Sequence, residues 1–275
     1  MPGTLHVVAT PIGNLADASP RALEALRAAD LVACEDTRTT RTLLAAHGIG
    51  ARTVALHEHN ERAAGAKLLR ELLAGRNVAL VSDAGTPAVS DPGALLVEAA
   101  HAAGVRVVPV PGPSAALAAY SAAGFAGSRF LFAGFLPAAH AARRKALAAL
   151  DLPYPVVLYE APHRVAETVA DLLERFGPER ELVIARELTK KFEEVARMKL
   201  GAARGWLAGG AHRAQGEFVL VLAPGAQRSA AAVDAARVLA VLREALPASE
   251  AAKLAARLTG ASRNELYAAA LKLPK

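Results

Sequence analysis

The first 225 residues alternate short apolar runs with longer amphipathic ones, and this alternation restricts the possible folds more than any other feature. A short apolar run followed by a helical pattern is typical of a strand and its crossover helix. Repetition of that unit implies a largely parallel sheet covered by helices. In the first half we expect strands at residues 5–10, 30–34, 52–56, 77–82 and 105–110. We expect helices at residues 40–47, 61–73 and 92–103, and a further one opened by Ser19-Pro20.

The alternation resumes after Pro111-Gly112-Pro113, a stiff joint that we interpret as a hinge between two α/β units. Strands are expected in the second unit at residues 130–132, 155–159, 182–185 and 218–222. Helices are expected at residues 114–123, 141–150, 163–176 and 200–207. The predicted organisation is an N-terminal α/β domain of residues 1–112, a C-terminal α/β domain of residues 113–225, and a helical tail of residues 226–275.

The tail is predicted to hold helices at residues 231–245, 249–258 and 263–271. Ser262-Arg-Asn-Glu265 has the spacing of a capping box, which would start the last helix at residue 263. Two helices joined by Thr259-Gly-Ala261 resemble a helix-turn-helix unit, and a plain helical hairpin packed on the second domain is an equally good interpretation.

Composition limits the partners and the compartment. The 275 residues carry a formal net charge of +6, and residues 226–275 contribute eight Lys/Arg against four Asp/Glu. A basic excess in one segment is compatible with a polyanionic partner such as RNA. No apolar run approaches the roughly 20 residues of a spanning helix, and there is no secretory pattern. Cys34 has no second cysteine to pair with and is expected to be a buried thiol. We therefore expect a cytoplasmic protein with no membrane association.

Four loops rich in Gly, Pro and small polar residues follow predicted strands, at residues 10–14, 82–87, 109–114 and 134–137. Ligands of open parallel sheets bind outside the carboxyl ends of the strands, and glycine lets backbone approach a ligand closely. We therefore expect these loops to share one pocket. The chain has neither a P-loop nor a G-x-G-x-x-G motif. His57-Glu-His59 could touch a metal, but a solvated turn is the simpler interpretation, and no metal is expected.

At these loops the sequence resembles the tetrapyrrole-methylase superfamily and, within it, the bacterial ribosomal RNA small-subunit methyltransferase I family. The first loop, Thr10-Pro-Ile-Gly-Asn14, has the form of that family, whereas corrin and porphyrin methylases usually carry G-x-G-P-G-D there. One departure is Ala138-Ala-His-Ala-Ala142, where the family is often rich in lysine. The other matching stretches, in family order, are Glu35-Asp-Thr-Arg38, His57-Glu-His-Asn-Glu61, Ala79-Leu-Val-Ser-Asp-Ala-Gly-Thr-Pro87, Val108-Pro-Val-Pro-Gly-Pro-Ser114, Gly134-Phe-Leu-Pro137, Tyr159-Glu-Ala-Pro-His-Arg164, Ala185-Arg-Glu-Leu-Thr-Lys190, Gly216-Glu217 and, in the tail, Ser262-Arg-Asn-Glu-Leu-Tyr267.

The resemblance implies a class III methyltransferase fold, two α/β domains with S-adenosylmethionine folded between them, and a homodimer. It implies 2′-O-methylation of a cytidine in the decoding region of 16S ribosomal RNA within the small subunit. The residues that it assigns to the cofactor are Pro11, Gly13, Asp83, Ala84, Gly85, Thr86, Pro87, Pro113, Ser114, Ala115, Leu136 and Leu188.

A ribose hydroxyl becomes a good nucleophile when a positioned base draws off its proton. The candidates for that base are Glu35, Asp36, Glu160, and Glu187 with Lys190, and we favour the Glu35–Asp36 pair because it directly follows a predicted strand. Glu160 and Glu187 could equally well pair with Arg164 and Arg186 in purely structural roles. The expected RNA contacts are Arg38, Arg143, Arg144, Arg164, Arg186, Lys253 and Arg263.

Two other functions compete with this interpretation. A corrin or porphyrin C-methyltransferase is disfavoured by the form of the first loop and by the basic tail. A non-catalytic RNA-binding protein is disfavoured because it would leave four ligand loops without a role.

Overall fold

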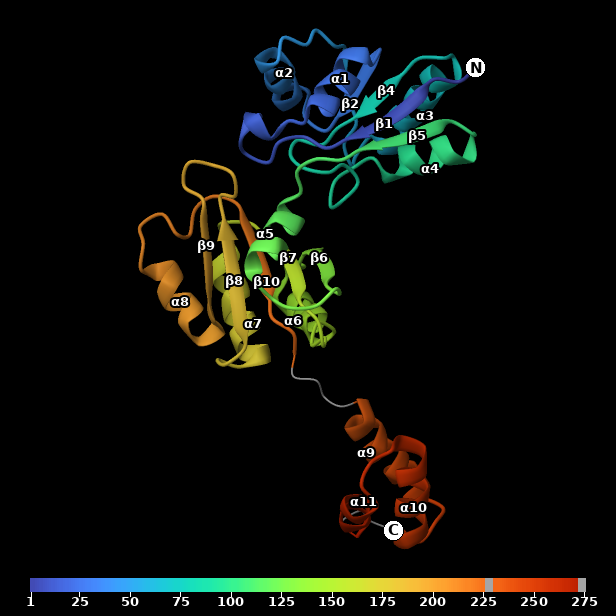
Figure 1. The fold of residues 1–275 in the computed structure, drawn as a ribbon, viewed down its shortest axis with the longest axis vertical. Helices are drawn as coiled ribbons and strands as arrows, with labels where there is room; N and C mark the ends of the chain where they lie inside the picture. The colour runs from blue at the N-terminus through green and yellow to red at the C-terminus, as the bar shows by residue number, and fades with distance from the viewer. Residues whose placement is uncertain (226–229, 272–275) are drawn as a thin grey trace.

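The computed structural model describes residues 1–225 and 230–271. Its first sheet has the strand order β3-β2-β4-β1-β5, and all its strand pairs are parallel (Figure 1). The strands are β1 (Thr4–Val8), β2 (Leu31–Cys34), β3 (Thr53–Ala55), β4 (Val78–Leu80) and β5 (Arg106–Val110). The helices that connect them are α1 (Pro20–Ala28), α2 (Thr37–Ala46), α3 (Glu61–Leu73) and α4 (Ala94–Ala102), with a short 3₁₀ turn η1 (Leu15–Asp17).

This sheet is covered on both faces, as the alternation of the sequence predicts. Leu68 of α3 and Leu96 of α4 pack on one face, and Leu26 of α1 and Leu44 of α2 pack on the other. Covering both faces buries β2 and β4 completely, which explains why these strands consist of continuous apolar runs. Cys34, at the end of β2, is buried as predicted.

Several of the residues that the sequence suggests as helix starts and ends do cap helices in the structure. Ser19 accepts a hydrogen bond from the backbone N–H of Ala22 at 3.1 Å and caps α1. Gly48 and Gly104, just after α2 and α4, adopt the left-handed conformation that ends a helix, with φ of 62° and 68°.

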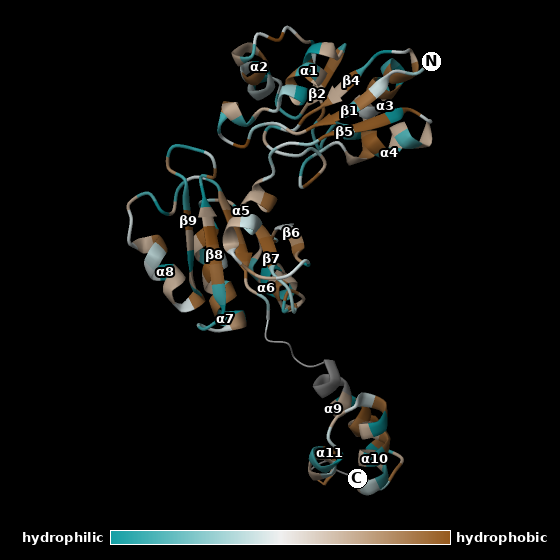
Figure 2. Ribbon diagram, in the orientation of Figure 1, coloured by the Kyte–Doolittle hydropathy of each residue, from teal (hydrophilic) through white to brown (hydrophobic). Residues whose placement is uncertain are grey.

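The second sheet has the order β6-β7-β10-β8-β9, and only its β6–β7 pair is parallel. Its strands are β6 (Leu131–Phe135), β7 (Val156–Glu160), β8 (Glu181–Arg186), β9 (Glu194–Lys199) and β10 (Phe218–Leu222). Helix α5 (Ala115–Ala123) covers one face, and α6 (His140–Ala148), α7 (Val165–Phe176) and α8 (Leu200–Ala208) cover the other. Hydrophobic residues concentrate on the strands of both sheets in Figure 2.

Strand β9 is absent from the sequence-based prediction, and its composition explains the omission. It reads Glu-Val-Ala-Arg-Met-Lys, and its residues alternate between half-buried and exposed. It is an edge strand that pairs antiparallel with β8 through all six of its residues. Because charged residues occupy much of the strand, it lacks the apolar run by which the other strands were recognised.

The tail forms three helices, α9 (Ala230–Arg243), α10 (Ala248–Thr259) and α11 (Arg263–Ala270), around a small core that includes Leu239 and Leu266. Helix α11 starts where predicted, but Ser262 makes no side-chain capping bond, so the predicted capping box does not form. Figure 1 draws this bundle apart from the two sheets. Residues 226–229 and 272–275, with Arg228, Lys272 and Lys275, lie outside the described residues, and the domain limits remain predictions. None of the helices in residues 1–225 and 230–271 combines the length and apolarity that a membrane crossing requires.

Candidate functional site

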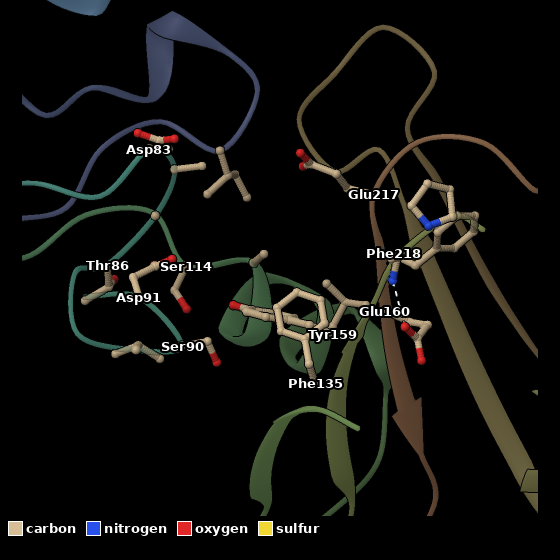
Figure 3. A pocket seen from close by; sticks show the side chains of 18 residues that line it. Asp83, Thr86, Ser90, Asp91, Ser114, Phe135, Tyr159, Glu160, Glu217 and Phe218 are labelled. Carbon is tan, nitrogen blue, oxygen red and sulfur yellow. Dashed lines mark hydrogen bonds between the residues drawn. The ribbon is translucent and has the colours of Figure 1, made fainter. Parts of the chain in front are cut away.

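A cavity of about 380 Å³ lies between the two sheets, a size typical of small-molecule sites (Figure 3). The loop after β4 lines one side with Asp83, Thr86, Ser90 and Asp91. Ser114, just before α5, lies beside this loop in Figure 3, and the end of β7 and the start of β10 line the other side. The cavity therefore lies at carboxyl ends of strands in the first sheet, where the sequence predicts a pocket.

Direct hydrogen bonds join three of the predicted ligand loops. The backbones of Thr10 and Gly85 exchange two hydrogen bonds, of 2.9 and 3.1 Å. The Thr86 hydroxyl donates to the carbonyl of Pro113 at 3.1 Å, and Ser114 caps α5. Gly85 has a φ of 83°, a conformation that suits glycine, and the Ile12 side chain lies against it. The loops thus form one connected wall.

Strained backbone concentrates around this wall. Among the described residues, four that are not glycine have left-handed backbone: Ala88, Ser90, Glu187 and Thr189. The first two lie in the loop that lines the cavity. The other two lie after β8, where Thr189 contacts Gly13 of the first loop. Each such residue costs on the order of 1–3 kcal/mol, and strain of this kind gathers at ligand sites.

The cavity is acidic. Four carboxylates line it, those of Asp83, Asp91, Glu160 and Glu217, and no Lys, Arg or His is among its described lining residues. Burial, together with the neighbouring carboxylates of Glu35 and Asp83, raises the pKa of Asp91 to about 6. Glu160 has Arg164 nearby and Glu217 has Lys190, whereas the structure gives no ion pair within residues 1–225 and 230–271 to Asp83 or Asp91, so the negative charge of these two favours a cationic ligand.

A second cavity, of about 430 Å³, adjoins the first. The first loop lines it with Pro11, Gly13 and Leu15, and α2 lines it from the opposite side. Three residues, Ile12, Asp83 and Ala84, line both cavities, which therefore meet at these residues.

The predicted cofactor residues fall into three groups. The first cavity is lined by six of them, Asp83, Ala84, Gly85, Thr86, Ser114 and Ala115. Pro11 and Gly13 line the second cavity. Pro87, Pro113, Leu136 and Leu188 line neither, although Pro113 accepts the bond from Thr86.

Sequence reasoning assigned no site role to several lining residues, including Val89, Asp91, Tyr159, Glu217 and Phe218, whereas Phe135 lies in the loop of residues 134–137 that was expected at the pocket. Tyr159 lies one residue before the end of β7, so its place near a strand terminus was the available signal. Burial raises the pKa of Tyr159, whose hydroxyl oxygen accepts the backbone N–H of Ala116 at 3.2 Å. This contact ties β7 to the start of α5.

The favoured Glu35–Asp36 pair lines neither cavity. Asp36 caps α2 and pairs with Arg38 at 2.7 Å, and the hydrogen bonds from Arg38 lower the pKa of Asp36 to about 2. Burial, and then the charge of Asp83, raises the pKa of Glu35. The two acids therefore differ, and the geometry of Asp36 favours a capping role over that of a base.

Glu160 lines the first cavity, but both of its oxygens are engaged and its side chain is fully buried. One oxygen accepts the backbone N–H of Ala161 at 2.8 Å, and the other accepts the Thr168 hydroxyl at 2.5 Å. Arg164 lies 3.4 Å from the first oxygen and donates to the carbonyl of Leu136 at 2.6 Å. This network holds the loop after β6 and matches the structural alternative foreseen for Glu160.

Glu187 and Lys190 meet at 2.9 Å, and Lys190 also lies 3.1 Å from Glu217. Although burial alone would lower it, the pKa of Lys190 is raised by its contacts with Glu187 and Glu217. Burial alone would raise the pKa of Glu187. The hydrogen bond and the charge of Lys190, with the backbone N–H of Glu217, outweigh burial and lower it. Lys190 therefore holds its proton, and its chain lies against Gly13, where it joins the two domains.

The arginines predicted to contact RNA separate into buried and exposed ones. Arg143 is 1 % exposed and pairs with Asp171, and Arg186 is 6 % exposed and donates to the carbonyls of Gln215 and Phe192. The burial of Arg143 and Arg186 contradicts an RNA contact for both. Arg164 is half-buried and donates to the carbonyls of Leu136 and Pro137, and its RNA contact stays a prediction. Those that are exposed are Arg38, Arg144, Lys253 and Arg263, of which Arg38 pairs with Asp36 and Arg144 with Glu174.

Comparisons with known proteins match the whole described architecture. The model of the tetrapyrrole (corrin/porphyrin) methylases matches residues 4–204, and that of the RsmI C-terminal HTH domain matches residues 229–274. Proteins named ribosomal RNA small subunit methyltransferase I are similar along nearly their full length. The one from Xylella fastidiosa (strain Temecula1) is 51 % identical over 97 % of this chain and 98 % of its own. The one from Escherichia coli O157:H7 is 47 % identical over 98 % of this chain and 95 % of its own.

Solved structures show the same fold at low identity. The methyltransferase CobJ superposes with a TM-score of 0.61 at 22 % identity, covering 82 % of this chain and 95 % of that one. A uroporphyrin-III C-methyltransferase from Thermus thermophilus, complexed with S-adenosylhomocysteine, has a TM-score of 0.56 at 18 % identity, covering 80 % and 97 %.

Proposed function

This chain belongs to the tetrapyrrole methylase family and, within it, to the ribosomal RNA small subunit methyltransferase I family, and we propose that it methylates the 2′-hydroxyl of a cytidine in 16S ribosomal RNA with S-adenosylmethionine as methyl donor. The observation that carries the proposal is the first cavity. It is acidic, lies between the two sheets and is lined by glycine-containing loops whose backbone a ligand can approach closely.

The residues of this cavity fit S-adenosylmethionine. The methyl donor is a cation with a sulfonium and an ammonium, and the carboxylates of Asp83 and Asp91 have no basic neighbour among the lining residues. Val89, Phe135 and Tyr159 offer apolar surface for a flat ring. When bound, the donor supplies a methyl group on a sulfonium, an activated leaving group.

The protein's own residues contribute position and electrostatics. Asp91 would pair with positive charge on the donor, and that pairing would reverse the shift of its pKa. The two backbone hydrogen bonds between Thr10 and Gly85 and the bond from Thr86 to Pro113 fix the positions of the three loops relative to one another. A preformed site of this kind lowers the cost of bringing two reactants into line.

We further propose that the substrate is the small ribosomal subunit, that the enzyme works in the cytoplasm and that it is a homodimer. The net charge of +6 and the exposed Lys253 and Arg263 of the tail support a polyanionic substrate. The family resemblance supports the dimer.

The test combines binding with methylation. Titration with S-adenosylmethionine and S-adenosylhomocysteine should release heat. Methylation of small subunits, naked 16S RNA and a porphyrinogen, followed by mass mapping, should place one methyl on a ribose and none on the porphyrinogen. A 2′-O-methylated nucleotide resists alkaline cleavage on its 3′ side. Methylation of the porphyrinogen alone would reverse the assignment.

A further inference from the structure

The second cavity offers space for a further ligand beside the first cavity, although Pro11 and Gly13, which the family resemblance assigns to the cofactor, line it. Its volume of about 430 Å³ lies within the range of small-molecule sites. It forms between two elements of the first domain, the loop after β1 and helix α2. Asp83, labelled in Figure 3 at the first cavity, also lines the second.

The two cavities meet at the residues that line both of them, Ile12, Asp83 and Ala84. The paired backbones of Thr10 and Gly85 fix the position of these neighbouring loops. Ligands in the two cavities would therefore lie next to each other at Asp83. Transfer of a methyl group between two ligands requires such adjacency.

The lining of the second cavity matches a nucleoside. Leu15 and Leu43 supply apolar surface, and Leu15 is 47 % exposed although it is a large hydrophobic residue. Thr39 supplies a hydroxyl from α2, and Thr42, whose hydroxyl donates to the carbonyl of Arg38 at 3.1 Å, supplies an acceptor oxygen on the same face. The neighbouring Arg38 side chain is 87 % exposed, so its guanidinium can meet a phosphate.

We propose that the second cavity receives the acceptor nucleoside, turned out of the RNA, with its ribose beside Asp83, where the two cavities meet. The inference rests on the proposed function and adds where the acceptor lies. Enzymes that modify a nucleotide inside folded nucleic acid commonly extrude it into a pocket. The base packs between Leu15 and Leu43, and the threonine hydroxyls bond its polar edge.

Asp83 is the carboxylate placed to receive the proton of the acceptor hydroxyl. Its Oδ1 accepts the backbone N–H of Asp36 at 2.9 Å, and no hydrogen bond within residues 1–225 and 230–271 engages Oδ2. In the transfer, the O–H bond breaks as the oxygen bonds the methyl carbon. The carbon–sulfur electron pair stays on sulfur, and the proton passes to Asp83 and then to solvent.

The test fills the cavity from its exposed edge. Thr39→Trp places an indole into the space from a solvent-facing position of α2, and Ala45→Trp places one on an exposed position of the same helix outside both cavities. Each variant is titrated with S-adenosylhomocysteine and assayed for methylation of small subunits. Binding of cytidine 5′-monophosphate to each S-adenosylhomocysteine complex is followed by saturation-transfer NMR.

We expect Thr39→Trp to bind S-adenosylhomocysteine like the unmodified protein, to lose the cytidine signal, and to fall at least about tenfold in kcat/KM for the RNA. Ala45→Trp should retain all three properties. A Thr39→Trp protein with unchanged kcat/KM would refute the acceptor assignment, and one that loses S-adenosylhomocysteine would assign the cavity to the cofactor instead. If the unmodified protein methylates no RNA, the proposed function itself fails, which is a different outcome.

Asp83→Asn tests the carboxylate separately. The amide oxygen can still accept the N–H of Asp36, so the loop should keep its shape. We expect kcat at saturating cofactor to fall about 100-fold or more, and because Asp83 also lines the first cavity, titration with S-adenosylhomocysteine separates any loss of cofactor affinity from the loss of turnover. Normal turnover in this variant would remove Asp83 from the reaction.

Discussion

Asp91→Asn should make the protein more stable and its cofactor site weaker, a combination that follows from one buried carboxylate. Burial and the nearby Glu35 and Asp83 raise the pKa of Asp91 from 3.8 to about 6. The folded protein therefore holds a proton on Asp91 at pH values where the unfolded chain has released it. Ionised Asp91 costs folding stability above about pH 6, and the cost disappears below about pH 4.

The size of the effect follows from that shift. At 1.36 kcal/mol for each unit of pKa, the ceiling is about 3 kcal/mol. Because Asp91 is only partly buried, solvent screening reduces the expected gain of Asp91→Asn to about 1–2 kcal/mol at pH 7.5. For a chain of this size the gain corresponds to about 2–8 °C in Tm. The difference between variant and unmodified protein should vanish near pH 4.

Cofactor binding should change in the opposite direction. A hydrogen bond between charged groups contributes about 1.5–3 kcal/mol, so losing a bond from the ligand's ammonium, which S-adenosylhomocysteine shares with the methyl donor, should weaken S-adenosylhomocysteine at least roughly tenfold in Asp91→Asn at pH 7.5. In the unmodified protein, affinity should fall as the pH drops below about 6, because Asp91 takes up a proton. The Asn variant should lack this dependence.

Scanning calorimetry across pH and isothermal titration at pH 5, 6 and 7.5 measure both effects. Glu98→Gln, an exposed position on α4, is the matched control for loss of one negative charge in the same domain. An Asp91→Asn protein that is no more stable at pH 7.5 and binds S-adenosylhomocysteine with normal affinity would refute the reasoning.

Four further outcomes are expected. Gly85→Val adds a branched side chain at a φ of 83°, beside the cavity, and should weaken S-adenosylhomocysteine by more than tenfold in calorimetric titration; unchanged affinity in a folded variant would remove this loop from the site. A chain ending at residue 225 should keep cofactor affinity but bind RNA more weakly, with a shallower salt dependence in filter binding; an unchanged salt slope would make the tail a packing element only. Asp36→Asn should turn over within a few-fold of normal, because Asn is an equally good helix cap, and a 100-fold loss would restore Asp36 as the base. Arg143→Met should cost about 3–5 kcal/mol in denaturant unfolding because it leaves Asp171 buried without its partner, and adding Asp171→Leu should recover most of that loss.

The sequence alone predicted much of the local structure correctly. Helix α3 and strand β10 have the predicted limits, and Ser19 caps α1 as expected. It also predicted that the glycine-rich loops after β1, β4 and β5 would meet. These features follow from periodicity and from single residues, such as proline and glycine, whose backbone preferences act within a few residues.

Only the tertiary structure decided how those pieces combine. The antiparallel pairing of most of the second sheet, and the presence of β9, depend on partners that lie far along the chain or that leave one face open to solvent. Arg143 looks like a surface cation in the sequence, yet Asp171, 28 residues away, holds it in the interior. The acidity of the first cavity likewise arises where Asp91 and Glu217 from different domains face one space. Sequence patterns report what each segment prefers, whereas burial, charge pairing and cavities are set by contacts between segments that no local pattern encodes.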